Sequence, residues 1–128
     1  MTEQKVFCKS APSDVYRALS TPLGRERFWA GSAPESGGVI AFALADGRTA
    51  NCAIERAVQD ELFQLEYFGR RIAFALTPGD AGGTDVTLSS DDDSPELVSL
   101  LLRLKAAVDF GVDLRNHDEH RTAGYLDS

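Results

Sequence analysis

The stretch FQLEYFGRRIAFAL, residues 63–76, decides the fold of this chain because it predicts a β-hairpin with one apolar face. Large apolar residues alternate with polar or smaller ones on both sides of Gly69-Arg70, which we take as a two-residue turn. A turn at these positions pairs Leu65 with Phe74. Both predicted strands then present their bulk to the same side, and that side requires a cover.

The same alternation occupies the segment before the hairpin, over residues 39–54. A two-residue turn at Asp46-Gly47 would set the apolar face of one strand against polar residues of the next. A three-residue loop over 45–47, with glycine in the left-handed conformation, instead pairs Phe42 with Ala50. We therefore predict the three-residue loop, which extends the apolar face by two more strands.

A long helix near the C-terminus supplies the predicted cover. A last strand is expected over residues 84–89, and the acidic segment 91–96, which also holds a serine and a proline, is typical of a helix start. Apolar residues then keep the spacing of one helical face. They are Leu97, Leu100, Leu101, Leu104, Ala107, Val108 and Gly111. We expect Gly111 to lie inside the helix, where its missing side chain leaves room for a bulky neighbour.

The N-terminal part of the chain predicts one strand and two short helices. A strand over residues 5–9 is followed by residues 10–14, where a proline and an acid suit a first helical turn. The Thr21 hydroxyl is expected to cap a second short helix, which ends near Phe28-Trp29. Residues 30–38 are expected to form a loop. This order of elements defines an α+β domain.

Length and composition favour a single domain over residues 1–128, with a polar and weakly patterned tail at 116–128. Apolar residues make up 43% and charged residues 26%, as in ordinary soluble globular proteins. The formal net charge of −7 argues against nucleic-acid binding, because the chain would repel phosphate backbones. No apolar run approaches the roughly 20 residues of a membrane helix, and residues 1–10 lack the apolar stretch of a signal peptide. We therefore expect a cytoplasmic protein that does not insert into membranes.

Several short motifs along the chain carry a resemblance to a known family. They are Ser10-Ala11-Pro12, Val15-Tyr16-Arg17-Ala18-Leu19, Phe28-Trp29, Gly82-Gly83-Thr84-Asp85-Val86-Thr87-Leu88 and Leu104-Lys105. These motifs resemble those of the START-like (SRPBCC) superfamily. Within it the chain most resembles the small bacterial proteins grouped with activators of the heat-shock-protein ATPase and with polyketide cyclases. The resemblance spans about residues 4–115 and is informative for the fold rather than for an activity.

The resemblance implies a helix-grip fold, in which a curved six-stranded antiparallel sheet wraps around the long C-terminal helix and two short helices follow the first strand. Between sheet and long helix this fold commonly holds a cavity for an apolar ligand. Strand parity and the helical stripe indicate most of the side chains that would line it, and the resemblance places Trp29, at the end of the second short helix, at the mouth of the cavity. The residues that we expect to contact a ligand are Trp29, Phe42, Phe63, Leu65, Tyr67, Phe74, Leu104 and Val108. A solid core made of the same residues is an equally weighted alternative.

The expected cavity offers little catalytic chemistry. Its only polar groups are the Tyr67 hydroxyl and the Cys52 thiol, and neither has an obvious partner, so we nominate no catalytic residue. His117 and His120 lie three residues apart but lack a third metal ligand, and the acidic residues 91–93 suit helix capping better than a metal. We therefore expect neither a metal nor a cofactor.

Three functions remain in competition. The leading hypothesis is a non-catalytic domain that binds a small hydrophobic molecule, such as a lipid or an aromatic metabolite. The second is a cyclase or dehydratase, with Tyr67 as an acid or an orienting group. The third is an interaction module that acts on a chaperone ATPase, which only the resemblance supports. The sequence also leaves a homodimer open.

Overall fold

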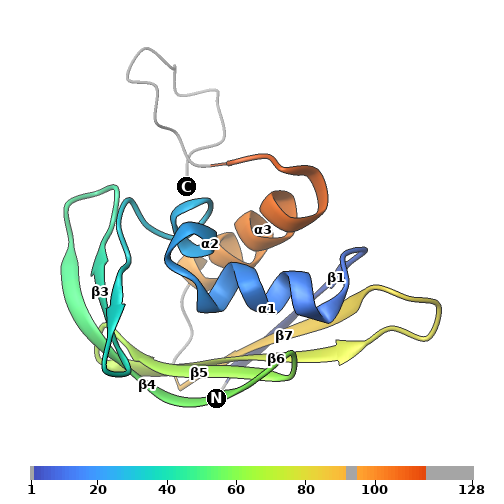
Figure 1. Ribbon diagram of the computed structural model, residues 1–128, viewed down its shortest axis with the longest axis horizontal. Helices are drawn as coiled ribbons and strands as arrows, with labels where there is room; N and C mark the ends of the chain where they lie inside the picture. The colour runs from blue at the N-terminus through green and yellow to red at the C-terminus, as the bar shows by residue number, and fades with distance from the viewer. Residues whose placement is uncertain (1, 92–94, 115–128) are drawn as a thin grey trace.

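A curved antiparallel sheet forms the frame of the protein, whose computed structural model describes residues 2–91 and 95–114 (Figure 1). Within these residues seven strands lie in the order β1-β7-β6-β5-β4-β3-β2, and three helices lie on the concave side. The elements are β1 (Thr2–Cys8), α1 (Pro12–Ser20), α2 (Pro22–Glu26), β2 (Glu35–Ser36), β3 (Val39–Ala43), β4 (Thr49–Val58), β5 (Leu62–Tyr67), β6 (Arg70–Pro78), β7 (Thr84–Ser90) and α3 (Pro95–Phe110). The predicted α+β class and the sheet around a C-terminal helix are confirmed. The predicted capping residues 92–94, the tail at 116–128 and the pair His117 and His120 lie outside the described residues.

A β-bulge in β4 helps the sheet to curve. The pairing of β4 with β5 shifts register between Ile54 and Arg56, and such bulges bend a strand and increase its twist. Beyond the bulge, β3 and β2 continue the sheet as a wall that turns toward the helices (Figure 1). The short strand β2 lies inside the expected loop and pairs Glu35 with Ile40, which raises the number of described strands from the predicted six to seven.

The β5–β6 hairpin turns one residue earlier than we predicted. Its turn is Phe68-Gly69 rather than Gly69-Arg70, so Leu65 pairs with Ile72 instead of Phe74. Both turn residues have positive φ angles, 50° and 85°, and two left-handed residues in a row give the turn that matches the twist of the strands. The error moves each pairing partner by two residues, so the same side chains still face the concave side.

The β3–β4 loop confirms the prediction of a three-residue connection. Phe42 pairs with Ala50, and the Leu44 N–H donates to the Arg48 carbonyl at 2.8 Å to close the loop. Gly47 has a φ of 96°, a left-handed conformation that a residue with a Cβ would adopt only with strain. The loop therefore places Arg48 at the rim of the sheet, where it reaches α3.

Helix α3 lies against the concave face and buries its apolar stripe there (Figure 1). The leucines of this stripe, Leu97, Leu100, Leu101 and Leu104, are buried. The expectation for Gly111 is wrong, because α3 ends at Phe110 and Gly111 follows it with a φ of 64°, which terminates the helix. A Cβ built on Gly111 would meet no described atom within 4 Å. The space beside it is therefore open, and no described side chain fills it.

A buried arginine holds the segment that carries Trp29. The guanidinium of Arg25 donates to the Ala33 carbonyl from Nε at 3.1 Å and from Nη2 at 2.7 Å, and to the Leu19 carbonyl from Nη1 at 3.0 Å. Burial lowers the pKa of Arg25. The Arg25 carbonyl in turn accepts the Trp29 N–H at 2.7 Å. The Thr21 hydroxyl caps α2, as predicted.

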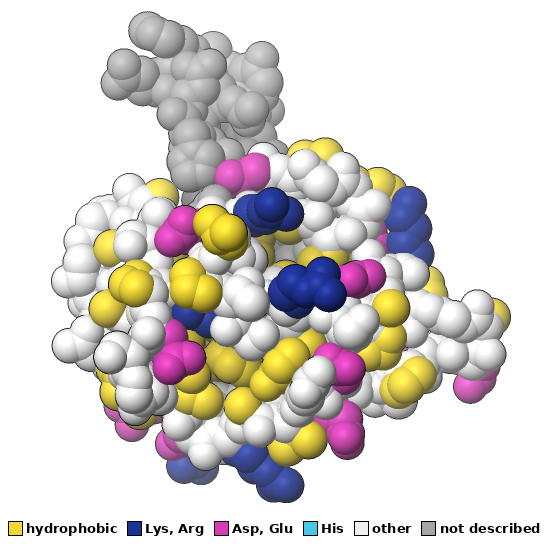
Figure 2. Space-filling view, viewed as in Figure 1, with side chains coloured by type: hydrophobic (Ala, Val, Ile, Leu, Met, Phe, Trp, Pro, Cys, Tyr) yellow, Lys and Arg dark blue, Asp and Glu magenta, His cyan; other side chains and the backbone are white. Residues whose placement is uncertain are grey.

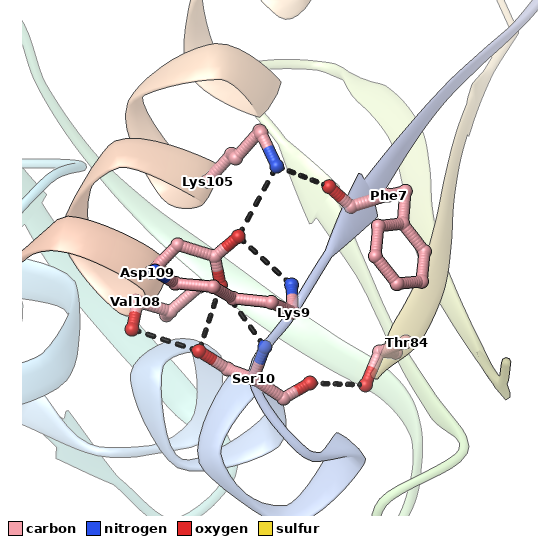
Figure 3. A network of polar contacts seen from close by, with 7 residues as sticks. All are labelled: Phe7, Lys9, Ser10, Thr84, Lys105, Val108 and Asp109. Atoms are coloured by element: carbon pink, nitrogen blue, oxygen red, sulfur yellow. Dashed lines mark hydrogen bonds and ion pairs between the residues drawn. The ribbon is translucent and has the colours of Figure 1, made fainter. Parts of the chain in front are cut away.

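A polar clamp joins the end of β1 to the last turn of α3 (Figure 3). Its centre is Asp109, whose side chain is only 1% exposed. The carboxylate accepts the Lys9 N–H at 2.9 Å, the Ser10 N–H at 3.1 Å and the Ser10 hydroxyl at 2.7 Å. Lys105 pairs with Asp109 at 3.1 Å and also donates to the Phe7 carbonyl. Burial acts to raise the pKa of Asp109, but the hydrogen bonds outweigh it and the pKa lies below its ordinary value. We call this arrangement the Asp109 clamp.

Candidate functional site

The fold brings together the residues that we expected to contact a ligand, with one exception. Those on the concave face are Trp29, Phe42, Phe63, Leu65, Tyr67, Phe74 and Leu104, and all of them are buried. The exception is Val108, which is half-buried and lines a surface groove enclosed by α1, α2 and the end of α3. Val108 packs against the edge of the core, and its position near the end of α3 leaves part of it in this groove.

Trp29 is the centre of an aromatic cluster on the concave face. Its ring centroid lies 4.8 Å from that of Phe42, 5.5 Å from that of Tyr67 and 5.5 Å from that of Phe74. Tilted and edge-on contacts at such distances stabilise aromatic pairs. Side chains of the protein itself therefore occupy the space around the indole, which is 2% exposed.

A small pocket opens at the edge of this cluster. It has a volume of about 210 Å³ and lies between the β3–β4 loop, β5 and the N-terminal half of α3. Its lining includes Trp29, Leu44, Arg48, Tyr67, Glu96 and Arg103. Of the expected ligand contacts, Trp29 and Tyr67 thus border open space. We call this site the Trp29–Tyr67 pocket.

The Tyr67 hydroxyl faces the charged side of the pocket. Burial raises the pKa of Tyr67 to about 12, the nearby Trp29 indole works against this shift, and Glu96, Arg48 and Arg103 act on it through their charges. Tyr67 and these three charged residues all line the pocket. A phenol with a pKa of about 12 keeps its proton at neutral pH and is a hydrogen-bond donor.

The Trp29 indole supplies a second donor. Its Nε1 is buried and has no hydrogen-bond partner among the described residues. It lies close enough to the Tyr67 hydroxyl to influence its pKa, but the two groups do not form a hydrogen bond of ordinary geometry. A buried donor without an acceptor costs about 1–3 kcal/mol. The pocket-lining residues Trp29 and Tyr67 therefore carry two hydrogen-bond donors, and the indole N–H has no acceptor among the described residues.

Ion pairs surround the mouth of the pocket. Arg48 pairs with Asp46 at 2.8 Å and with Glu96 at 3.2 Å. Arg70 pairs with the other oxygen of Glu96 at 2.7 Å. Glu96 thereby connects the first turn of α3 to the β3–β4 loop and to the start of β6. These side chains are partly exposed, so each pair contributes at most about 1 kcal/mol.

Sequence reasoning missed these mouth residues. It treated Glu96 only as part of an acidic helix start and Arg70 only as a residue of the predicted turn. Arg48 directly follows the β3–β4 loop, whose length the sequence does predict. A loop between two strands lies at the rim of the sheet, and this position is the signal that could have identified Arg48. Their convergence depends on how the curved sheet brings the β3–β4 loop against α3, which residue spacing does not encode.

The remaining reactive groups in the described part of the chain do not assemble a catalytic or metal site. Cys8 and Cys52 are buried free thiols, and burial raises the pKa of Cys8 to about 11 and also raises that of Cys52, which keeps both protonated and unreactive. No group of three or more His, Cys, Asp or Glu side chains that could hold a metal occurs within residues 2–91 and 95–114. In the same residues, no helix has the length and apolar character needed to cross a membrane.

A curved antiparallel sheet that grips a C-terminal helix, with two short helices after the first strand, is the helix-grip fold that the resemblance implies. Comparison with solved structures confirms this class. The neighbours include an Aha1 protein and a protein from the dynemicin biosynthetic locus. The chain therefore has the START-like fold.

Three solved structures illustrate the similarity. The crystal structure of protein SSP2350 from Staphylococcus saprophyticus has a TM-score of 0.76 at 23% identity, over 88% of this chain and 94% of that one. The solution structure of the Aha1 dimer from Colwellia psychrerythraea has a TM-score of 0.69 at 19% identity, over 87% of this chain and 98% of that one. DynU16, a protein of the dynemicin biosynthetic locus, has a TM-score of 0.68 at 13% identity, over 86% of this chain and 47% of that one. No protein-family model matches the chain, and no curated protein matches it significantly.

Proposed function

We propose that the protein binds a small, flat, uncharged molecule in the Trp29–Tyr67 pocket and holds it through an acceptor oxygen. The observation that carries this proposal is the buried Trp29 Nε1 without a partner, beside the Tyr67 hydroxyl. A ligand oxygen placed between these two donors would satisfy both. The aromatic cluster behind Trp29 would keep the indole in the orientation that such a contact needs.

The volume of the pocket supports a ligand with one ring. An apolar cavity of roughly 150 Å³ is large enough to bind benzene. The 210 Å³ of this pocket would therefore accommodate a ring with a short substituent. The wall provides aromatic surface from Trp29 and Tyr67 and aliphatic surface from Leu44, so the ring would contact apolar groups while its substituent contacts the donors.

The charges at the mouth support an uncharged ligand. The Arg48 guanidinium is already paired with Asp46 and Glu96, and Glu96 is shared with Arg70. A buried anion needs a charged partner to offset its loss of hydration. Phe42 and Phe74 support the Trp29 indole from behind, and Phe63, Leu65 and Leu104 complete the apolar surroundings.

The chain contains one tryptophan, so its indole N–H gives a single NMR signal that reports on the pocket directly. We expect acetophenone to shift this signal to saturation, whereas ethylbenzene, which has the same shape without the oxygen, should bind about two- to tenfold more weakly. The Tyr67→Phe variant should reduce the difference between the two probes. An indole signal that neither probe moves would refute the proposal.

A cyclase- or dehydratase-like enzyme is the second candidate. The Tyr67 hydroxyl favours it, because a protonated phenol close to Glu96 and Arg48 could donate a proton or orient a carbonyl oxygen. If a turnover reaction is found, Tyr67→Phe should abolish most of it, and unchanged turnover would exclude this role. A chaperone-directed function has no equivalent observation in its favour, since similarity below 25% identity establishes the fold alone.

A further inference from the structure

A groove on the outside of the helices forms a second site. It is enclosed by α1, α2 and the last turns of α3, and its volume is about 700 Å³. Figure 2 shows exposed apolar side chains on this face, with basic and acidic ones around them. The groove and the Trp29–Tyr67 pocket have no lining residue in common. We call it the α1–α2–α3 groove.

The floor of this groove is apolar and open to solvent. Its apolar lining is formed by Ala18, Pro22, Leu23, Ala107 and Val108. Leu23 is 71% exposed. Contiguous apolar surface of this kind marks binding sites more often than scattered exposed residues do.

The walls of the groove are held in place. A Cβ on Gly24 would lie 2.6 Å from the Ala18 Cα, which means that the backbones of α2 and α1 are in direct contact. The Asp109 clamp fixes the adjoining turn of α3 to the start of α1 (Figure 3). Small-molecule sites are usually formed in advance in this way.

Two arginines flank the apolar floor. The exposed side chain of Arg27 makes no hydrogen bond or ion pair with any described residue. Arg17 pairs with Asp14 at 3.4 Å, and these two side chains are 68% and 53% exposed, so the pair is weak and readily exchanged. Asp14 also lines the groove, so its charged lining is two arginines and one carboxylate, and this positive balance on a chain with a net charge of −7 complements an anion.

We propose that the α1–α2–α3 groove binds a single-chain carboxylate, whose apolar chain lies on the floor and whose carboxylate contacts Arg17 and Arg27. The planar guanidinium fork matches the two oxygens of a carboxylate, which gives short and directional hydrogen bonds. The volume of about 700 Å³ falls within the usual range of ligand sites, roughly 300–1,000 Å³. This site is independent of the ligand in the Trp29–Tyr67 pocket.

The test uses decanoate as the probe, below the concentration at which it forms micelles, with decanol as its uncharged match. Decanoate should shift the backbone amide signals of α1, α2 and the last turns of α3 to saturation, and the Trp29 indole signal should stay in place. Arg27→Gln should weaken decanoate binding about tenfold, and Leu23→Ser should weaken both probes. Arg56→Gln, an exposed arginine on β4, is the matched control and should change neither.

Four results would overturn the proposal. Equal binding of decanol and decanoate would show that the arginines do not recognise a carboxylate. If decanoate shifted the Trp29 indole signal and left the groove amide signals unchanged, it would bind in the Trp29–Tyr67 pocket rather than in the groove. Groove amides that shift with protein concentration alone would show that a second copy of this chain covers the groove. If decanoate bound with unchanged affinity to a variant that carries both Arg17→Gln and Arg27→Gln, the two arginines would not be the groups that recognise the carboxylate.

Discussion

Replacing Asp109 with alanine is a direct test of how the ends of β1 and α3 are held together. The change removes the acceptor of the Lys9 and Ser10 N–H groups and of the Ser10 hydroxyl, and it removes the partner of Lys105. A buried hydrogen bond to a charged group is worth roughly 1.5–3 kcal/mol. The groups on Lys9 and Lys105 are partly exposed and can turn to water, so we expect the free energy of unfolding to fall by about 3 kcal/mol rather than by the full sum.

Urea denaturation followed by circular dichroism measures this loss, which corresponds to a fall in Tm of roughly 10–15 °C. Asp109→Asn keeps an acceptor oxygen for Ser10 and should lose about half as much. Asp85→Ala on β7 is the control, because this exposed carboxylate lies outside the clamp and its removal should stay within about 0.5 kcal/mol.

The clamp also predicts the sign of a pH effect. Because the folded-state pKa of Asp109 is lowered, the carboxylate stabilises the protein above its unfolded-state pKa of about 3.9. This contribution is lost as the pH falls through the lower folded-state pKa. The stability difference between the unchanged protein and Asp109→Asn should therefore shrink in acid. A difference that stays constant down to pH ~2, or a cost of Asp109→Ala below about 1 kcal/mol at neutral pH, would refute the reasoning.

Further predictions concern the backbone, the pocket mouth and assembly. Gly24→Ala should cost about 2 kcal/mol in urea denaturation, because its Cβ would lie 2.6 Å from the Ala18 Cα, whereas Gly31→Ala, with its nearest contact at 3.4 Å, should be close to neutral. Glu96→Gln should change stability by less than about 1 kcal/mol yet accelerate hydrogen exchange of the Trp29 indole, since it loosens the ion pairs at the mouth; an unchanged exchange rate would contradict this. Sedimentation velocity over a range of protein concentrations tests the homodimer, and a constant monomer mass would exclude it.

The hairpin from Phe63 to Leu76 shows what an alternating pattern determines and what it does not. Alternation assigns each side chain to a face, and the predicted inward residues are buried. A slip of two residues leaves that assignment unchanged, so the pattern could not distinguish a turn at Phe68-Gly69 from one at Gly69-Arg70. The choice depended on Phe68 adopting a positive φ of 50°, which is uncommon for a bulky residue and was not expected.

The candidate site was predictable in part for a similar reason. Strand alternation correctly grouped Tyr67 with the buried aromatic residues, whereas Trp29 was assigned from the family resemblance and is buried as well. Helical periodicity placed Val108 among the cavity residues, although this half-buried side chain lines the groove beside α1 and α2. The pairing of Arg48 with Glu96 joins residues 48 positions apart, and only the curved sheet brings them together.

The order of strands in the sheet has a consequence for how the chain reaches its folded state. β1 pairs only with β7 among the described strands, so Thr2 lies opposite Ser90 and Cys8 opposite Thr84. During synthesis the first strand therefore remains without its neighbour until nearly the whole sheet has left the ribosome. Its unpaired backbone N–H and C=O groups could meanwhile pair with a strand of another chain. Closing so long a loop is entropically costly and late. Lys5 lies in β1 and Lys9 follows it, and their positive charges disfavour the pairing of an unwanted strand with β1.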